Sequence, residues 1–100
     1  MTLGKTIKRL RAQEGVGIKT LGPRLGVDPT YLSKLENDRA RPSQAVIRRI
    51  ARYFHYDSEE LSLLAGRVPP DVQKILQDNP REAIAFLRKR FVNGARRESS

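Results

Sequence analysis

Apolar residues recur every three or four positions along most of this chain, and no stretch alternates apolar and polar residues as a strand would. This spacing places the apolar side chains on one face of a helix, so the sequence predicts an all-α protein. The predicted helices cover about residues 3–14, 18–25, 29–37, 44–54, 58–65, 71–77 and 80–92. Gly15, Gly26 and Gly66 mark three of the helix ends, because glycine readily takes the conformation that ends a helix.

Three of the predicted helices begin at side chains that can cap them. Asp28 stands before Pro29, and this pair suits the capping position and the first helical position, where the missing proline N–H is not needed. Ser43 stands before the fourth helix. Asp57 and Glu60 form a pattern similar to a capping box at the start of the fifth. These residues indicate where the helices begin.

Two glycines stand where two closely joined helices need them. Gly22 is small at the point where helices joined at a steep angle by a short turn come close. Gly26 lies where the chain reverses, and a positive φ is least strained in glycine. The apolar residues around this turn are expected to be buried: Leu21, Leu25, Val27, Leu32 and Leu35. The outward side of the third helix, which carries Thr30, Ser33, Lys34 and Asn37, then remains free to enter a DNA major groove.

The segment from Ile7 to Leu61 resembles the lambda-repressor-like helix-turn-helix family, also called the Cro/repressor or Xre type. It follows the five-helix order of that family, and the stretches "YLSKLEN" and "PS" before a helix are typical of it. The resemblance implies a five-helix DNA-binding domain over residues 1–66, with one or two additional C-terminal helices. Residues 67–92 are expected to form this helical extension, and residues 93–100 a flexible basic tail.

The resemblance also implies which residues contact bases. In the family, these contacts come from the first residues of the third helix and from one turn later. The corresponding positions here are Pro29, Thr30 and Lys34, flanked by Tyr31 and Ser33. Lys34 is suited to donate to guanine O6 and N7, and Thr30 to touch a thymine or adenine edge.

Phosphate contacts are implied for the loop after the third helix and the start of the fourth, at Asn37, Arg39, Arg41 and Ser43. The family often begins its second helix with Thr-Gln, and the glutamine grips a phosphate or a base beside it. Here Gly17-Ile18 stand instead, so that contact is lost and Lys19 is expected to replace it with a plain charge contact.

Pro23 is a second departure from the family pattern. It removes the hydrogen bond to the Lys19 carbonyl, so we expect either a second helix that starts late, near Thr20, or an unusual angle of the third helix. Arg11 and Glu36 occupy positions where the family often has a partly buried ion pair between the first and third helices. The alternative is a surface pair worth less than about 1 kcal/mol, and we favour the structural pair.

The chain is strongly basic, with 20 Lys and Arg against 11 Asp and Glu, a net charge of +9 and a pI near 10.7. Such an excess favours a polyanionic partner, nucleic acid first and an anionic membrane second, although a merely basic soluble surface is the alternative. No run of 18 apolar residues and no secretion signal is visible, so we expect a cytoplasmic protein without a membrane span. The lack of cysteine excludes disulfides and thiolate metal sites.

Catalysis is not expected, because no nucleophile stands with a base in the sequence. His55 is the only histidine, and a packed or helix-capping role is a better interpretation than a metal ligand. We therefore expect neither a metal nor a cofactor.

The C-terminal third is open to two interpretations. Its apolar residues repeat at helical spacing: Val72, Ile75 and Leu76, then Ile84, Leu87 and Phe91. They form either extra core or a dimer surface, and both can hold. The joint "LAGRVPPDVQKILQDNP" also resembles regulators that are encoded with a metallopeptidase or a toxin, which suggests a partner protein.

These observations predict a sequence-specific regulator of transcription that binds double-stranded DNA. The expected form is a repressor that binds a palindromic operator as a homodimer through its third helix, with half-sites roughly 34 Å apart. The alternative is a protein-docking adapter or an antitoxin that keeps the fold and binds a partner protein through its C-terminal helices.

Overall fold

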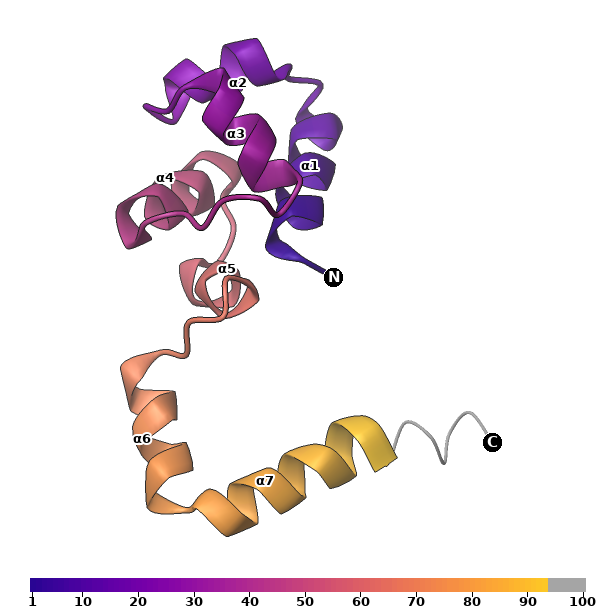
Figure 1. The fold of residues 1–100 in the computed structure, drawn as a ribbon, viewed down its shortest axis with the longest axis vertical. Helices are drawn as coiled ribbons and strands as arrows, with labels where there is room; N and C mark the ends of the chain where they lie inside the picture. The colour runs from indigo at the N-terminus through magenta and orange to yellow at the C-terminus, as the bar shows by residue number, and fades with distance from the viewer. Residues whose placement is uncertain (94–100) are drawn as a thin grey trace. The chain divides into compact units, whose positions relative to one another are not determined.

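A computed structural model describes residues 1–93, and every regular element in this part of the chain is helical (Figure 1). The helices are α1 (Leu3–Glu14), α2 (Ile18–Arg24), α3 (Pro29–Glu36), α4 (Gln44–Phe54), α5 (Ser58–Leu64), α6 (Pro70–Asp78) and α7 (Pro80–Arg88), and a π-helical segment (Lys89–Asn93) follows. The prediction of an all-α fold is confirmed. The tail expected over 93–100 lies outside the described residues, except for Asn93. None of the helices within 1–93 is long and apolar enough to cross a membrane.

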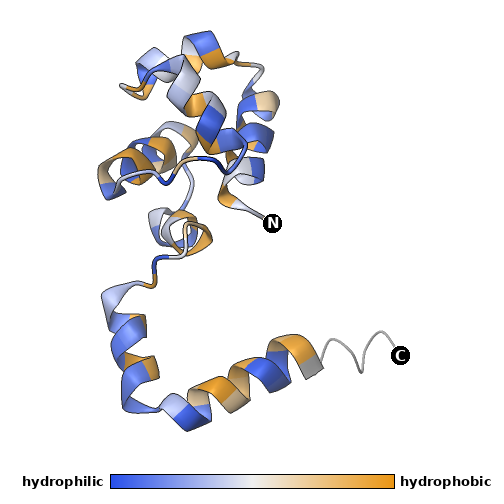
Figure 2. Cartoon of the chain, viewed as in Figure 1, coloured by the Kyte–Doolittle hydropathy of each residue, from blue (hydrophilic) through white to orange (hydrophobic). Residues whose placement is uncertain are grey.

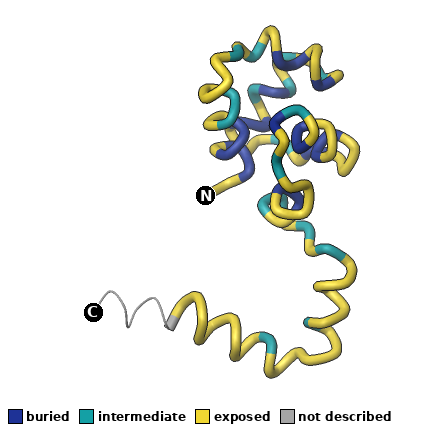
Figure 3. Tube along the Cα trace, turned by 180° about the vertical axis from the view of Figure 1, so that it is seen from behind, coloured by how far each residue is buried: buried dark blue, intermediate teal, exposed yellow. Residues whose placement is uncertain are grey.

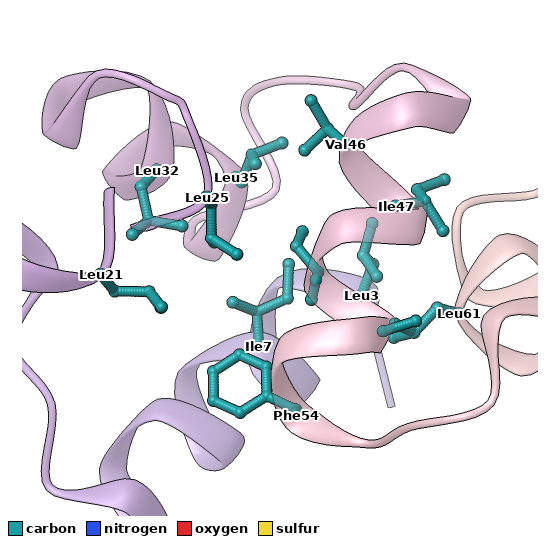
Figure 4. Packing of buried hydrophobic residues seen from close by; sticks show 12 residues of the cluster. Leu3, Ile7, Leu21, Leu25, Leu32, Leu35, Val46, Ile47, Phe54 and Leu61 are labelled. Carbon is teal, nitrogen blue, oxygen red and sulfur yellow. The ribbon is translucent and has the colours of Figure 1, made fainter. Parts of the chain in front are cut away.

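The chain divides into two units, Met1–Val68 and the residues from Pro69 onward. In the first unit, α1 to α5 surround one apolar core (Figure 4), and the dark blue segments of Figure 3 mark its buried residues. The core consists of Leu3, Ile7, Leu21, Leu25, Leu32, Leu35, Val46, Ile47, Ile50, Ala51, Phe54 and Leu61. Burying each of the larger side chains stabilises the fold by roughly 1.5–3 kcal/mol relative to leaving it exposed.

Side-chain caps begin α3, α4 and α5. Asp28 accepts a hydrogen bond from the Thr30 N–H at 2.7 Å, and Ser43 accepts one from the Val46 N–H at 3.2 Å. Asp57 Oδ1 accepts a hydrogen bond from the Glu60 N–H at 2.9 Å. Each cap satisfies an N–H that the first turn of a helix leaves without a partner. The sole histidine, His55, ends α4 in a left-handed conformation with φ 53° and is exposed.

The first turn of α1 lies directly against the end of α3 at Gly4. A Cβ atom on Gly4 would lie 2.5 Å from the Glu36 carbonyl oxygen and 2.6 Å from that of Leu35. The Gly4 N–H donates to Asp38 Oδ1 at 3.0 Å, and Asp38 itself has a positive φ of 56°. The absence of a side chain at Gly4 is therefore what allows the two backbones to meet.

An ion pair makes a second contact between α1, near its C-terminal end, and Glu36, the last residue of α3. Arg11 donates from Nε to Glu36 Oε2 at 2.7 Å and from Nη2 to Oε1 at 3.0 Å, and its Nη1 donates to the Val16 carbonyl at 3.1 Å. The Glu36 side chain is only 4% exposed, so this carboxylate depends on Arg11 for its charge balance. The hydrogen bonding with Glu36 raises the pKa of Arg11 above its ordinary value.

Pro23 lies inside α2, and the alternative of a late helix start near Thr20 is wrong. The helix begins at Ile18, and the Thr20 and Leu21 N–H groups both donate to the Gly17 carbonyl, at 3.1 and 2.9 Å. Pro23 is exposed and stands in the last turn of this short helix, where a missing N–H removes a single hydrogen bond.

The second unit consists of α6, α7 and the π-helical segment. Pro70 and Pro80 start its two α-helices, and Asn79 joins them. Asn79 Nδ2 donates to the Ile75 carbonyl at 3.0 Å, and the Asn79 carbonyl accepts from the Ala83 N–H at 2.8 Å. No residue of α6 or α7 is buried, although Figure 2 shows hydrophobic bands on both.

We expect Gly4→Ala to lower the free energy of unfolding by about 1–3 kcal/mol, because the added methyl overpacks the contact with α3. Helix propensity alone would change stability in the opposite direction, by about 1 kcal/mol. Urea unfolding followed by circular dichroism measures the difference.

Gly17→Ser is the matched control, because a Cβ at Gly17 would meet nothing within 4 Å and serine is a good capping residue. This variant should be as stable as the wild type or slightly more stable. A stabilising effect of Gly4→Ala would contradict the close contact.

Candidate nucleic-acid interface

The two sides of α3 differ sharply in burial. Leu32, Leu35 and Glu36 are buried, and α3 packs against α1 and α2. Thr30 and Lys34 lie one turn apart on the opposite side, and both are exposed. The same segment of helix is therefore anchored along one side and open to solvent along the other.

The remaining residues implied in base contact, Pro29, Tyr31 and Ser33, are each half-buried. Ser33 lies one turn after Thr30 and one turn before Asn37, so all three lie on the same side of the helix. Tyr31 lies on a flank of the helix and packs partly against the core. The structure thus brings Thr30, Ser33 and Lys34 together on one surface and leaves Pro29 and Tyr31 at its edges.

The turn between α2 and α3 depends on two glycines. A Cβ on Gly22 would lie 2.9 Å from the Val27 carbonyl oxygen and 3.2 Å from the Pro29 nitrogen, so α2 and the start of α3 meet without room for a side chain. Gly26 has φ +71°, a conformation that other residues adopt with strain. These positions set the direction in which α3 leaves the turn.

The loop between α3 and α4 runs beside α3. The Tyr31 hydroxyl donates to the Arg41 carbonyl at 3.4 Å, a long hydrogen bond that joins the loop to the flank of α3. Asn37 Nδ2 donates to the Ser33 carbonyl at 2.9 Å. The side chains of Arg39 and Arg41 are exposed. Ser43 caps the eleven-residue helix α4, and the first N–H groups of this helix are suited to bind an anion.

The exposed cations of this region are not neutralised by acids. Within residues 1–93, no carboxylate lies within 4 Å of the charged groups of Lys34, Arg39 or Arg41. Lys19 is likewise exposed and without such a partner in that range, but it stands in the first turn of α2, and no hydrogen bond in the described part joins it to α3. Lys34, Arg39 and Arg41 thus lie on α3 and on the loop hydrogen-bonded to it, and Lys19 lies on α2, which packs against α3.

Two further arginines, Arg49 on α4 and Arg24 at the end of α2, join this region to α4, and the sequence analysis did not single them out. Arg49 Nη1 donates to the Leu25 carbonyl at 3.3 Å, next to Gly26, and Arg24 Nη1 donates to the Tyr53 hydroxyl at 2.8 Å. Both pairs join the end of α2 to α4. The sequence offered little signal for them, because an outward arginine on an amphipathic helix looks like any solvated charge.

The dimensions of α3 suit a groove of double-stranded DNA. An α-helix with its side chains is about 10–12 Å in diameter, and the major groove of B-DNA is about 12 Å wide. The exposed hydroxyl, amide and ammonium groups along α3 are hydrogen-bonding groups of the kind that reads base edges. Among the described residues, no three His, Asp or Glu side chains gather as metal ligands.

Comparisons with known proteins agree with this geometry. Residues 2–64 match the family described as the helix-turn-helix domain. Uncharacterised HTH-type transcriptional regulators from two strains of Mycobacterium tuberculosis are each 31% identical to this chain over 75 residues. That match covers 75% of this chain and 54% of each relative, so the chain spans about half the length of these relatives.

A solved structure is similar over most of the chain. The clp gene regulator ClgR from Corynebacterium glutamicum superposes with a TM-score of 0.56 and 22% identity, covering 89% of both chains. At that identity the likeness supports the fold alone. The match over residues 2–64 confirms the family resemblance from the sequence, and the chain belongs to the helix-turn-helix domain family.

Proposed function

We propose that this protein is a DNA-binding regulator of transcription that inserts the exposed side of α3 into the major groove of double-stranded DNA. The observation that carries the proposal is the exposure of Thr30 and Lys34 on a helix whose other side is buried in the core. The relatives from Mycobacterium tuberculosis are named as HTH-type transcriptional regulators, and this supports the same class of function.

The proposed complex divides its contacts into two kinds. Thr30, Ser33 and Lys34, with Pro29 and Tyr31 at the edges, read bases, and Asn37, Arg39, Arg41 and Ser43 hold the phosphate backbone. Lys19 adds one phosphate contact from α2. The net charge of +9 adds a long-range attraction that weakens as salt rises.

We further propose that the protein acts as a homodimer on a palindromic operator and represses transcription by occupying the promoter. A single α3 of eight residues reads only a few base pairs, and two-fold pairing of protomers doubles the site. Occupation of a promoter by such a dimer blocks polymerase without further machinery.

Selection of duplexes from a random pool, sequenced after a few rounds, tests the function. We expect a motif with two-fold symmetry whose halves lie about 10–10.5 base pairs apart, or a multiple of that spacing. Absence of any motif, together with co-purification of a stoichiometric protein partner, would instead support the adapter or antitoxin role.

Lys34→Ala should weaken binding to the selected duplex by about 1–3 kcal/mol and leave binding to random DNA little changed, because a base contact is lost. Fluorescence anisotropy with labelled duplexes of both kinds measures the two affinities.

Two further variants serve as comparisons for the affinity change of Lys34→Ala. Arg41→Ala should weaken both duplexes and reduce the slope of log K against log salt by about one unit, as expected for a phosphate contact. Lys8→Ala removes an equal charge from the exposed side of α1 and should affect both duplexes least. Equal losses on both duplexes for Lys34→Ala would contradict base reading at this residue.

A further inference from the structure

Arg67 binds both residues that flank Ser43 in the chain. Its Nη2 donates to the Pro42 carbonyl, and its Nη1 donates to Gln44 Oε1 at 3.3 Å. Gln44 is the first residue of α4, and Ser43 is the cap of that helix and one of the proposed phosphate contacts. One guanidinium group therefore spans the point where the loop between α3 and α4 becomes helix.

The backbone of Arg67 is fixed at the end of α5. Its N–H donates to the Ser62 carbonyl at 2.9 Å. Ser62 is only 6% exposed, and its Oγ accepts a hydrogen bond from Gln44 Nε2 at 2.8 Å. Ser62, Gln44 and Arg67 thus form a closed chain of hydrogen bonds that joins the end of α5 to the start of α4.

The loop that Arg67 holds has few other restraints. Within residues 1–93, no backbone–backbone hydrogen bond involves Ala40, Arg41 or Pro42. The Tyr31 hydroxyl donates to the Arg41 carbonyl only at 3.4 Å. A recess of about 150 Å³ lies between this loop, the start of α1 and the end of α5, so apolar packing does not fill the space beside the loop. Pro42 is buried and has no N–H, and Arg67 supplies a partner for its carbonyl.

The guanidinium groups of Arg67 and Arg41 differ in what they contact. Arg67 is half-buried, and both of its terminal nitrogens donate to uncharged acceptors of the protein. Arg41 is exposed and has no carboxylate within 4 Å in the described part of the chain, so its charge is available to a phosphate. A guanidinium group holds its donors in one rigid plane, whereas a lysine ammonium is a point charge on a flexible stem. Only arginine can therefore hold Pro42 and Gln44 together in this geometry.

We infer that Arg67 is a positioning residue for the phosphate contacts: it holds residues 40–44 in the conformation that presents Arg41 and Ser43 to the DNA backbone, and it makes no contact with DNA itself. The inference rests on the proposed function, because it concerns the same DNA site. Arg67 stands two residues before Pro69, where the second unit begins. Phosphate binding then depends on the paired donors of a residue far along the chain from the loop, and not on the charge of that residue.

Arg67→Lys separates the two roles, because it keeps the charge and loses the paired donors. Fluorescence anisotropy should show roughly two- to tenfold weaker binding to the selected duplex and to random DNA alike, since the lost hydrogen bonds no longer order the loop. The slope of log K against log salt should fall by about one unit although the net charge is unchanged.

Arg24→Lys is the matched control for this substitution. Arg24 also donates from Nη1 to an uncharged acceptor on α4, the Tyr53 hydroxyl, at 2.8 Å, but neither residue belongs to the loop. This variant should keep the affinity and the salt slope of the wild type. Urea unfolding of both variants checks that each is folded under the conditions of the binding measurement.

The free protein gives a second readout that does not involve DNA. Relaxation of backbone ¹⁵N nuclei should give lower order parameters for Ala40 and Arg41 in Arg67→Lys than in the wild type or in Arg24→Lys, because the loop has lost a restraint. In addition, Arg67→Lys should change the affinity for DNA less when Arg41 is already alanine, because the contact that Arg67 positions is then absent.

Three results would overturn the inference. Unchanged affinity and salt slope in Arg67→Lys would show that only the charge of Arg67 acts, as in a direct phosphate contact. Unchanged order parameters of the loop, or losses of affinity in Arg67→Lys and Arg41→Ala that simply add, would remove the positioning role. The DNA proposal fails separately, when selection from random duplexes gives no motif while the order parameters of the loop still fall in Arg67→Lys.

Discussion

The close packing of α3 on α1 is the constraint on which the rest of the first unit depends. Gly4 lets the backbone of α1 approach the last carbonyls of α3, and the pair of Arg11 and Glu36 holds α3 from the other end of α1. Both contacts hold the last turn of α3, and the buried Leu32 and Leu35 anchor the same side of the helix in the core. A rigid α3 matters for recognition because base readout requires hydrogen-bonding groups held in fixed positions.

The same packing determines the charge that α3 presents. Glu36 is the only acid of this helix, and it is turned inward, buried and paired with Arg11. The outward side therefore carries Lys34, which has no carboxylate within 4 Å in the described part of the chain, and the loop that follows adds Arg39 and Arg41. A single buried ion pair thus stabilises the fold and also removes a negative charge that would repel a phosphate backbone.

Much of the fold followed from local signals in the sequence. The caps at Asp28, Ser43 and Asp57 and the helical spacing of apolar residues depend only on neighbours along the chain, so the helix boundaries were predicted closely. The role of Gly4 and the contact from Arg49 to the Leu25 carbonyl depend on residues brought together by folding, and no local pattern marks them. The late start of α2 expected from Pro23 is wrong, because Pro23 stands in the last turn of α2, where it removes only one hydrogen bond. The proposed contacts of Thr30 and Lys34 follow from the family resemblance, and the structure adds their exposure on one surface.

Intermolecular nuclear Overhauser effects between the labelled protein and its selected duplex test the central claim most directly, because they report which protons lie within a few ångströms of a base. The account predicts contacts from the Thr30 methyl group and the Lys34 side chain to base protons that face the major groove, and none from Lys8 on α1. Contacts confined to the minor groove, or to α6 and α7 with none from α3, would contradict it.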